Sequence, residues 1–295
     1  MPLRLFTFLF LLTLTFNFSC TPESGEEVSS SSITSAPLPQ GDLFIIGGGK
    51  RPPSLITDLL KIAKVQAGQG QIMIFPQASS EPDTSAFYAK KQFLELGIRP
   101  DQLLVYTDSL LTSLDQLVGL ELIYFCGGDQ NRLMDFIQLD SPLYQALRKT
   151  YQKGSTMAGT SAGAAIMSEI MITGNEKRYP EYTGFFRTIE ADNIETARGM
   201  GFLQDVIVDQ HFIYRMRMNR LITAVLEQPG KSAFGIDEST AVHVFQDSMQ
   251  VYGQSQVIVL HNPNQSVKQQ ETLLSGEGLI LDVRTAGSAH PLPGK

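Results

Sequence analysis

Gly159, Ser161 and Gly163 form a Gly-x-Ser-x-Gly pattern within the stretch MAGTSAGAA. Such a pattern can place a nucleophilic serine on a sharp turn between a strand and a helix, because small neighbours let the backbone bend and leave the hydroxyl exposed. A helix that begins near Ala162 would direct its first amides toward negative charge that develops at this turn. An ordinary glycine-rich turn has the same composition, so the interpretation depends on whether the chain also supplies a base and an acid.

The chain has four histidines, and one of them lies where a base is needed. His211 ends the stretch VIVDQH, which reads as a buried strand, and ligand sites in open α/β sheets lie at the carboxyl ends of strands. His243 falls inside an alternating strand pattern, and His261 and His290 fall in polar, terminal stretches. His211 is therefore the candidate base, while a histidine that only packs would suit the same position.

The acid that would orient this base has candidates in two places. Asp237 and Glu238 follow the apolar residues FGI, again at a predicted strand end. Asp209 precedes His211 by two residues, and side chains two residues apart in an extended strand point to the same face. The residues alone leave this choice open.

Three arginines, Arg215, Arg217 and Arg220, follow the candidate base at the start of a predicted helix. Positive side chains at the positive N-terminal end of a helix are unfavourable unless an anion lies nearby. Solvated charge on a surface helix is the simpler interpretation. A substrate that bears carboxylates would also remove the conflict.

The elements that must position these residues alternate along the chain. Short apolar runs, typical of strands buried on both faces, alternate with stretches of helical spacing, which predicts an α/β fold with a parallel sheet covered by helices on both faces. Strands are predicted at 42–49, 71–79, 101–108, 120–129, 155–162, 206–212 and 232–240, and helices at 54–67, 84–98, 141–154 and 217–228.

The last part of the chain has a different pattern. Residues 241–262 and 271–283 read as strands separated by turns, so we expect a C-terminal antiparallel extension. No linker rich in proline or glycine divides residues 42–285, which we predict to be one domain, with residues 286–295 as a C-terminal tail. The stretch 171–200 carries no motif; it could form a wall of the site.

The N-terminus reads as a targeting segment. An apolar run from Leu5 to Phe16, followed by Cys20 after a small residue, is similar to a bacterial lipoprotein signal. Residues 1–19 would be the signal peptide, Cys20 the lipidated residue, and residues 20–41 a flexible tether. The chain is then exported and lipid-anchored in the cell envelope, in the periplasm or on the outer surface, with the lipid bilayer as a partner. An ordinary secretory signal and an uncleaved membrane anchor are the alternatives.

Composition narrows the function classes further. Hydrophobic residues make up 42% and charged residues 18% of the 295 residues, which fits a packed globular protein. The formal net charge of −7 gives no reason to expect a nucleic-acid partner, since such proteins favour a basic surface. Cys126 is the only cysteine after Cys20, so no internal disulfide is expected. No spacing typical of metal ligands appears.

Four motifs, in this order and at these separations, resemble those of cyanophycinase, a serine exopeptidase related to dipeptidase E. They are GGDQ (127–130), GTSAGA (159–164), DQHFIYRMRMNRL (209–221) and GIDESTA (235–241), and the similarity covers roughly residues 42–260. The resemblance implies a class I glutamine-amidotransferase-like α/β fold and a triad of Ser161, His211 and Glu238. It therefore favours Glu238 over Asp209 as the acid.

The resemblance also implies a substrate. The residues that it places around the substrate are Gln130, Asp209, Gln210, Arg215, Arg217 and Arg220. The implied reaction is hydrolysis of cyanophycin, multi-L-arginyl-poly-L-aspartate, to β-aspartyl-arginine dipeptides, with the amides of Gly128 and Ala162 as candidates for the oxyanion hole. No metal or organic cofactor is implied.

Two other functions stay open at this point. An aspartyl dipeptidase of the dipeptidase E type would share the fold, the turn and the base. A non-catalytic envelope lipoprotein that binds acidic peptides is the other alternative, although an intact serine, histidine and acid argue against it. The arginine-rich segment favours the polymer, since a multiply charged substrate needs more charge-assisted contacts. A homodimer also stays open.

Overall fold

The computed structural model describes residues 41–107, 113–181, 185–287 and 289–293. The predicted signal peptide, the lipidation site Cys20 and all but the last residue of the predicted tether lie outside these ranges. The described residues belong to one compact unit, Leu38–Lys295. Within them, no helix has both the length and the apolar character needed to cross a membrane.

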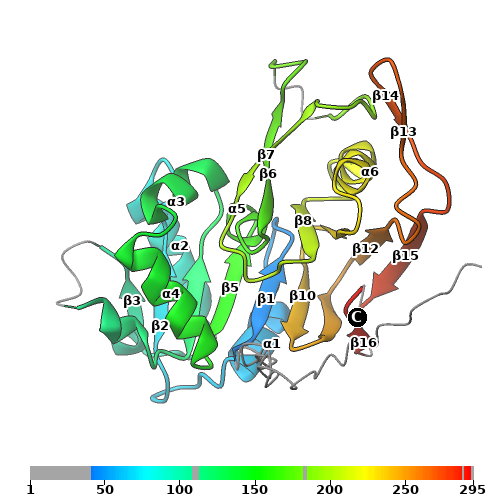
Figure 1. Ribbon diagram of the computed structural model, residues 1–295. Coiled ribbons are helices and arrows are strands. Elements are labelled where there is room, and N and C mark those ends of the chain that lie inside the picture. The colour runs from blue at the N-terminus through cyan, green and yellow to red at the C-terminus, as the bar shows by residue number, and fades with distance from the viewer. Residues whose placement is uncertain (1–40, 108–112, 182–184, 288, 294–295) are drawn as a thin grey trace, which may run out of the picture. The chain divides into compact units, whose positions relative to one another are not determined.

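Eight strands form the main sheet (Figure 1). In spatial order they are β16 (His290–Pro291), β11 (Ser248–Gly253), β10 (Thr240–Phe245), β1 (Leu43–Ile46), β5 (Thr156–Thr160), β4 (Leu122–Phe125), β2 (Ile72–Phe75) and β3 (Leu103–Val105). The strands from β1 to β3 in this order pair in parallel. β10 joins β1 antiparallel, and β11 and β16 continue antiparallel. The predicted parallel sheet with an antiparallel extension is confirmed.

Helices cover both faces of this sheet, because its strands are apolar on both sides. Leu43 and Ile45 of β1 belong to one apolar cluster, and Phe44 and Ile46 belong to the other, as expected for side chains that alternate along a strand. The first cluster includes side chains of α3 (Gln130–Ile137), α4 (Pro142–Gln152) and the short α5 (Ala162–Ala165). The second includes side chains of α1 (Pro53–Ile62) and α2 (Pro82–Leu94).

The strands that precede His211 and Glu238 do not extend the main sheet. They are β8 (Val206–Gln210) and β9 (Ser232–Ile236), which pair in parallel with each other and form a second sheet with β12 (Gln256–His261) and β15 (Ile280–Thr285). Helix α6 (Met218–Glu227) packs on one face of this sheet through Leu221 and Val225. Val208 and Phe234, on the other face, join the core of the main sheet. The loops that carry Ser161, His211 and Glu238 therefore come from two sheets that share one core.

Two segments in which the sequence predicts no helix or strand contain short strands. The stretch without a motif forms an antiparallel pair of strands, β6 (Ile170–Glu176) and β7 (Ile194–Arg198). The predicted tail 286–295 is not free in its described part, because β16 pairs with β11 and Leu292 is buried. The remaining elements are two 3-10 turns, η1 (Pro100–Gln102) and η2 (Leu114–Leu117), and a small hairpin of β13 (Lys268–Gln270) and β14 (Leu273–Ser275).

Candidate active site

Ser161 lies between β5 and α5 with a φ of 54°, in the left-handed region that side-chain-bearing residues rarely adopt. The glycines on either side explain why the chain can make this turn. A Cβ at Gly159 would lie 2.1 Å from the carbonyl oxygen of Gly163, and a Cβ at Gly163 would lie 2.4 Å from that of Phe125. Only glycine fits both positions, so the pattern marks a sharp strand-to-helix turn that presents the serine.

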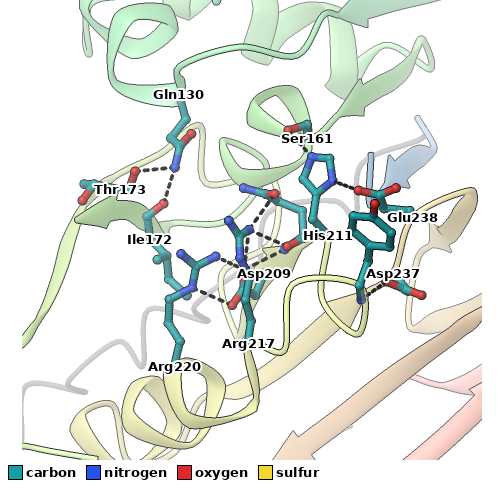
Figure 2. A network of polar contacts seen from close by, with 12 residues as sticks. Gln130, Ser161, Ile172, Thr173, Asp209, His211, Arg217, Arg220, Asp237 and Glu238 are labelled. Atoms are coloured by element: carbon teal, nitrogen blue, oxygen red, sulfur yellow. Dashed lines mark hydrogen bonds and ion pairs between the residues drawn. The ribbon is translucent and has the colours of Figure 1, made fainter. Parts of the chain in front are cut away.

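His211 connects Ser161 to Glu238 (Figure 2). Its Nε2 lies 2.8 Å from Oγ of Ser161, and its Nδ1 lies 2.6 Å from Oε1 of Glu238. A neutral imidazole protonated on Nδ1 would donate to the carboxylate and accept from the serine hydroxyl. The three side chains come from the loops after β5, β8 and β9, which the sequence places far apart.

Burial lowers the pKa of His211 below the usual value for histidine. The hydrogen bond that Nδ1–H of His211 donates to Glu238 opposes this effect, and the positive charge of Arg215 adds to it. The net result is a lowered pKa, which favours the neutral imidazole. A neutral imidazole is the form that can take a proton from Ser161.

Asp209 does not contact His211, so the expectation that the two share a strand face is wrong. β8 ends at Gln210, and His211 has a φ of 50°, which turns its side chain away from the direction that a continuing strand would give. The carboxylate of Asp209 is only 1% exposed and accepts hydrogen bonds from Arg220. It also accepts the backbone N–H of Gln210 at 2.7 Å.

The arginines at the start of α6 have anionic and polar partners inside the protein. Arg220 pairs with Asp209, and Arg217 donates to the backbone oxygen and to Oε1 of Gln210 at 2.6 and 2.9 Å (Figure 2). Only 5% of each arginine is exposed. The negative charge of Asp209 therefore offsets the unfavourable positive charge at the start of α6, and a substrate is not needed for this. Arg215, unlike Arg217 and Arg220, is half-buried.

Asp237, adjacent to Glu238, makes contacts that sequence reasoning missed. Its Oδ1 accepts the backbone N–H of Tyr214 at 2.8 Å, and its Oδ2 accepts the hydroxyl of Ser255 at 2.6 Å. Tyr214 belongs to the loop that follows His211. Asp237 therefore joins the loop that follows His211 to the strand end that carries Glu238. Only its place beside Glu238 signalled it in the sequence.

Gln130 connects the first turn of α3 to β6. Its side-chain amide donates to the backbone oxygens of Ile172 and Thr173 at 2.9 and 2.5 Å, and its side chain is buried (Figure 2). Beyond this contact, the segment after β6 forms a small pocket with the two buried arginines. Its lining residues include Gly174, Glu176, Tyr179, Phe185, Phe186, Arg217 and Arg220. The stretch 171–200 thus supplies a pocket wall beside the site.

The glycines after β4 lie next to the serine. A Cβ at Gly127 would lie 3.3 Å from Cβ of Ser161, and a Cβ at Gly128 would lie 2.2 Å from the carbonyl oxygen of Ala78. Among the described residues, the N–H groups of Gly128 and Ala162 donate no backbone hydrogen bond to another residue. Both expected oxyanion donors are thus without a partner inside the protein in this part of the chain.

One protein family matches the part of the chain that contains all three of these residues. The model of peptidase family S51 matches residues 43–252, which include Ser161, His211 and Glu238. The chain belongs to peptidase family S51. The match ends before β12 and β15, so the S51 region comprises the main sheet without β16, together with β8 and β9.

The chain is similar to curated cyanophycinases. The chain is 34% identical to the cyanophycinase of Synechococcus elongatus over 198 residues, which are 64% of this chain and 58% of the relative. It is 34% identical to the cyanophycinase of Trichormus variabilis over 203 residues, which are 66% of this chain and 64% of the relative. The chain spans less than two thirds of the length of these relatives.

A solved structure shares the S51 fold of this chain. The crystal structure of a peptidase from an acI-B1 Actinobacterium aligns with a TM-score of 0.61 at 22% identity, over 85% of this chain and 97% of that one. This similarity supports the fold. In the described part of the S51 chain, no group of three or more His, Cys, Asp and Glu side chains could hold a metal ion.

Proposed function

We propose that this S51 chain is a serine peptidase that hydrolyses cyanophycin to β-aspartyl-arginine dipeptides. The observation that carries the proposal is the continuous contact from Ser161 through His211 to Glu238. This order of hydroxyl, imidazole and carboxylate is what nucleophilic catalysis by serine requires. The substrate is proposed from the similarity to curated cyanophycinases.

In the proposed reaction, Oγ of Ser161 attacks the carbonyl carbon of the scissile bond while Nε2 of His211 takes the hydroxyl proton. Glu238 holds the imidazole in the tautomer protonated on Nδ1 and stabilises the imidazolium that forms. His211 then gives its proton to the leaving amine. Water, deprotonated by the same imidazole, attacks the acyl-serine and releases the second product. The route uses only these side chains and water.

The backbone N–H groups of Gly128 and Ala162 would stabilise the oxyanion. Gly128 lies in the loop after β4 and Ala162 begins α5 directly after Ser161, and neither has a backbone partner within the described residues. A donor of this kind contributes about 3 kcal/mol to transition-state stabilisation. The tight packing of Gly128 against Ala78 keeps its loop in place beside Ser161.

The pocket lined by Arg217 and Arg220 has charged residues of both signs. It contains the guanidinium groups of Arg217 and Arg220 together with the carboxyl groups of Glu176 and Glu181. A β-aspartyl-arginine unit carries both charges and so has groups that complement both sets.

The test is product analysis with purified chain. Wild-type protein should release β-aspartyl-arginine from cyanophycin, and Ser161→Ala should lower the rate by several orders of magnitude while staying folded. Ser248→Ala, on an exposed position of β11, is the matched control and should keep wild-type turnover. Cleavage of α-aspartyl dipeptides but not of polymer would identify an aspartyl dipeptidase. Tight binding of polymer without any product would identify a binding lipoprotein.

We also propose that the chain is exported and held in the cell envelope by a lipid on Cys20. The support is the sequence from Leu5 to Cys20, an apolar run that ends in a cysteine after a small residue. Cys20→Ser should abolish incorporation of labelled fatty acid and release the chain from membranes. Equal incorporation by both proteins, or by neither, would remove this proposal.

A further inference from the structure

Three consecutive carbonyl groups at the end of β1 accept hydrogen bonds from the loops that carry the proposed triad. The backbone N–H of Ser161 donates to the oxygen of Ile46 at 3.0 Å, and that of His211 donates to the oxygen of Gly47 at 2.7 Å. The third acceptor is the oxygen of Gly48, at 3.0 Å from the backbone N of Ser239, the residue after Glu238. One strand end thus contacts all three loops.

The three donors share an uncommon backbone conformation. Ser161, His211 and Ser239 have φ values of 54°, 50° and 56°, all in the left-handed region. Residues with a Cβ persist in this region only where the surrounding structure holds them there. The carbonyl groups of Ile46, Gly47 and Gly48 are the common partner of the three strained residues. These carbonyl groups therefore hold the backbone of each residue in place just after the strand that precedes it.

The glycines of the same turn leave the space that the triad occupies. A Cβ at Gly48 would lie 2.4 Å from Cε1 of His211, and a Cβ at Gly49 would lie 2.4 Å from Oε2 of Glu238. Both distances are far below van der Waals contact. A methyl group at either position would have to push the imidazole or the carboxylate away.

We propose that the turn Gly47–Gly49 is the positioning element of this active site. Its carbonyl groups fix the backbone of the three loops, and its missing side chains let His211 and Glu238 approach each other. This inference rests on the proposed serine mechanism. It adds residues that do not touch the reacting atoms but set the distances between those that do.

Two substitutions test the space requirement. Gly48→Ala should displace the imidazole from Ser161 and lower kcat by about 100-fold with little change in KM, since a shift of about 1 Å in a catalytic group has that effect. Gly49→Ala should displace the carboxylate and lower kcat to a similar extent. Its φ of 66° is accessible to alanine at modest cost, so this variant keeps the test open where Gly48→Ala is too strained.

Two glycines elsewhere provide controls with matched backbone conformation. Gly119 has a φ of 102°, close to the 110° of Gly48, and a Cβ there would meet nothing within 4 Å. Gly201 has the same φ of 66° as Gly49, and the nearest atom to its Cβ would be 3.5 Å away. Gly119→Ala and Gly201→Ala introduce similar backbone strain without a collision. Both should keep kcat within about two-fold of wild type, because neither contacts the triad.

A second readout does not depend on the substrate. The low-field proton resonance of Nδ1–H of His211 reports its hydrogen bond to Glu238 in the free protein. It should shift or disappear in Gly48→Ala and Gly49→Ala and stay unchanged in both controls. If wild-type protein cleaves no peptide, the proposed function fails while this resonance still tests the positioning role.

Two results would overturn the inference. One is wild-type kcat together with a wild-type resonance in both Gly48→Ala and Gly49→Ala. The other is loss of folding in both variants while Gly119→Ala and Gly201→Ala fold normally. That outcome would make the turn a requirement of the whole domain and not of the active site.

Discussion

Arg220 and Asp209 form an ion pair inside the protein, with Nε of Arg220 2.8 Å from Oδ2 of Asp209 and exposed fractions of 5% and 1%. Removing one charge of such a pair leaves the other buried without compensation. Asp209→Asn should therefore lower the free energy of unfolding by about 3–5 kcal/mol, measured by urea denaturation. Asp101→Asn, which breaks an exposed pair with Arg99, is the control and should change it by less than about 1 kcal/mol. Equal effects of the two variants would contradict a structural role for Asp209.

Arg215 should set the acid limb of the pH–rate profile. Its positive charge opposes the imidazolium form and so contributes to the lowered pKa of His211. Without that charge the pKa rises, and a higher pH is needed to produce the neutral base. In Arg215→Gln, the midpoint of the acid limb of kcat/KM should move to higher pH, whatever the change in its maximum. A midpoint that stays in place or moves to lower pH would show that Arg215 does not act on the base.

Glu238 should act on the chemical step. Glu238→Gln removes the charge that stabilises imidazolium and favours the wrong tautomer of His211, so kcat should fall by about three to four orders of magnitude with KM little changed. Glu169→Gln, at a surface ion pair with Lys231, is the matched control. Near-normal kcat in Glu238→Gln would remove this carboxylate from the mechanism.

Asp237 should act through the loop that follows His211. Asp237→Ala removes the acceptor for the backbone N–H of Tyr214 and for the hydroxyl of Ser255. We expect kcat to fall about 10- to 100-fold, since the base loses the contact that fixes its loop. Asp237→Asn retains an oxygen for Tyr214 and should recover most of the activity. If asparagine is no better than alanine, the negative charge of Asp237 matters and the hydrogen bond to Tyr214 does not.

Much of the fold could be predicted because its signals are local. The apolar stretches FIIGGG and MIF mark strands buried on both faces, and the glycines around Ser161 mark a turn that only small residues allow. The strands β6 and β7 were not predicted. The alternation of Ile194, Glu195 and Thr196 covers too few positions to identify a strand, and Gln130 from a distant helix supports the backbone of β6.

The sequence predicted which residues lie in the candidate site. It did not predict all the contacts between them. Spacing suggested that Asp209 and His211 share a face, and that inference assumed a strand that continues past Gln210. The left-handed φ of His211 depends on the hydrogen bond from its N–H to Gly47, which is far away in the sequence. The burial of Arg220 likewise depends on how α6 packs on the second sheet. Such long-range contacts leave no pattern in the neighbouring residues.

The turn after β1 also joins the first strand of the domain to loops that are synthesised much later. β1 leaves the ribosome before every other strand in the described part of the chain, yet its partner β10 comes after almost the whole domain has been made, with Leu43 opposite Val244. A nascent chain that reaches α6 contains Ser161 and His211 but lacks the acid and the last donor to the turn. Pairing over such a sequence separation is also slow. A nascent chain that ends before Glu238 therefore lacks the contact between His211 and Glu238 on which the proposed activity depends.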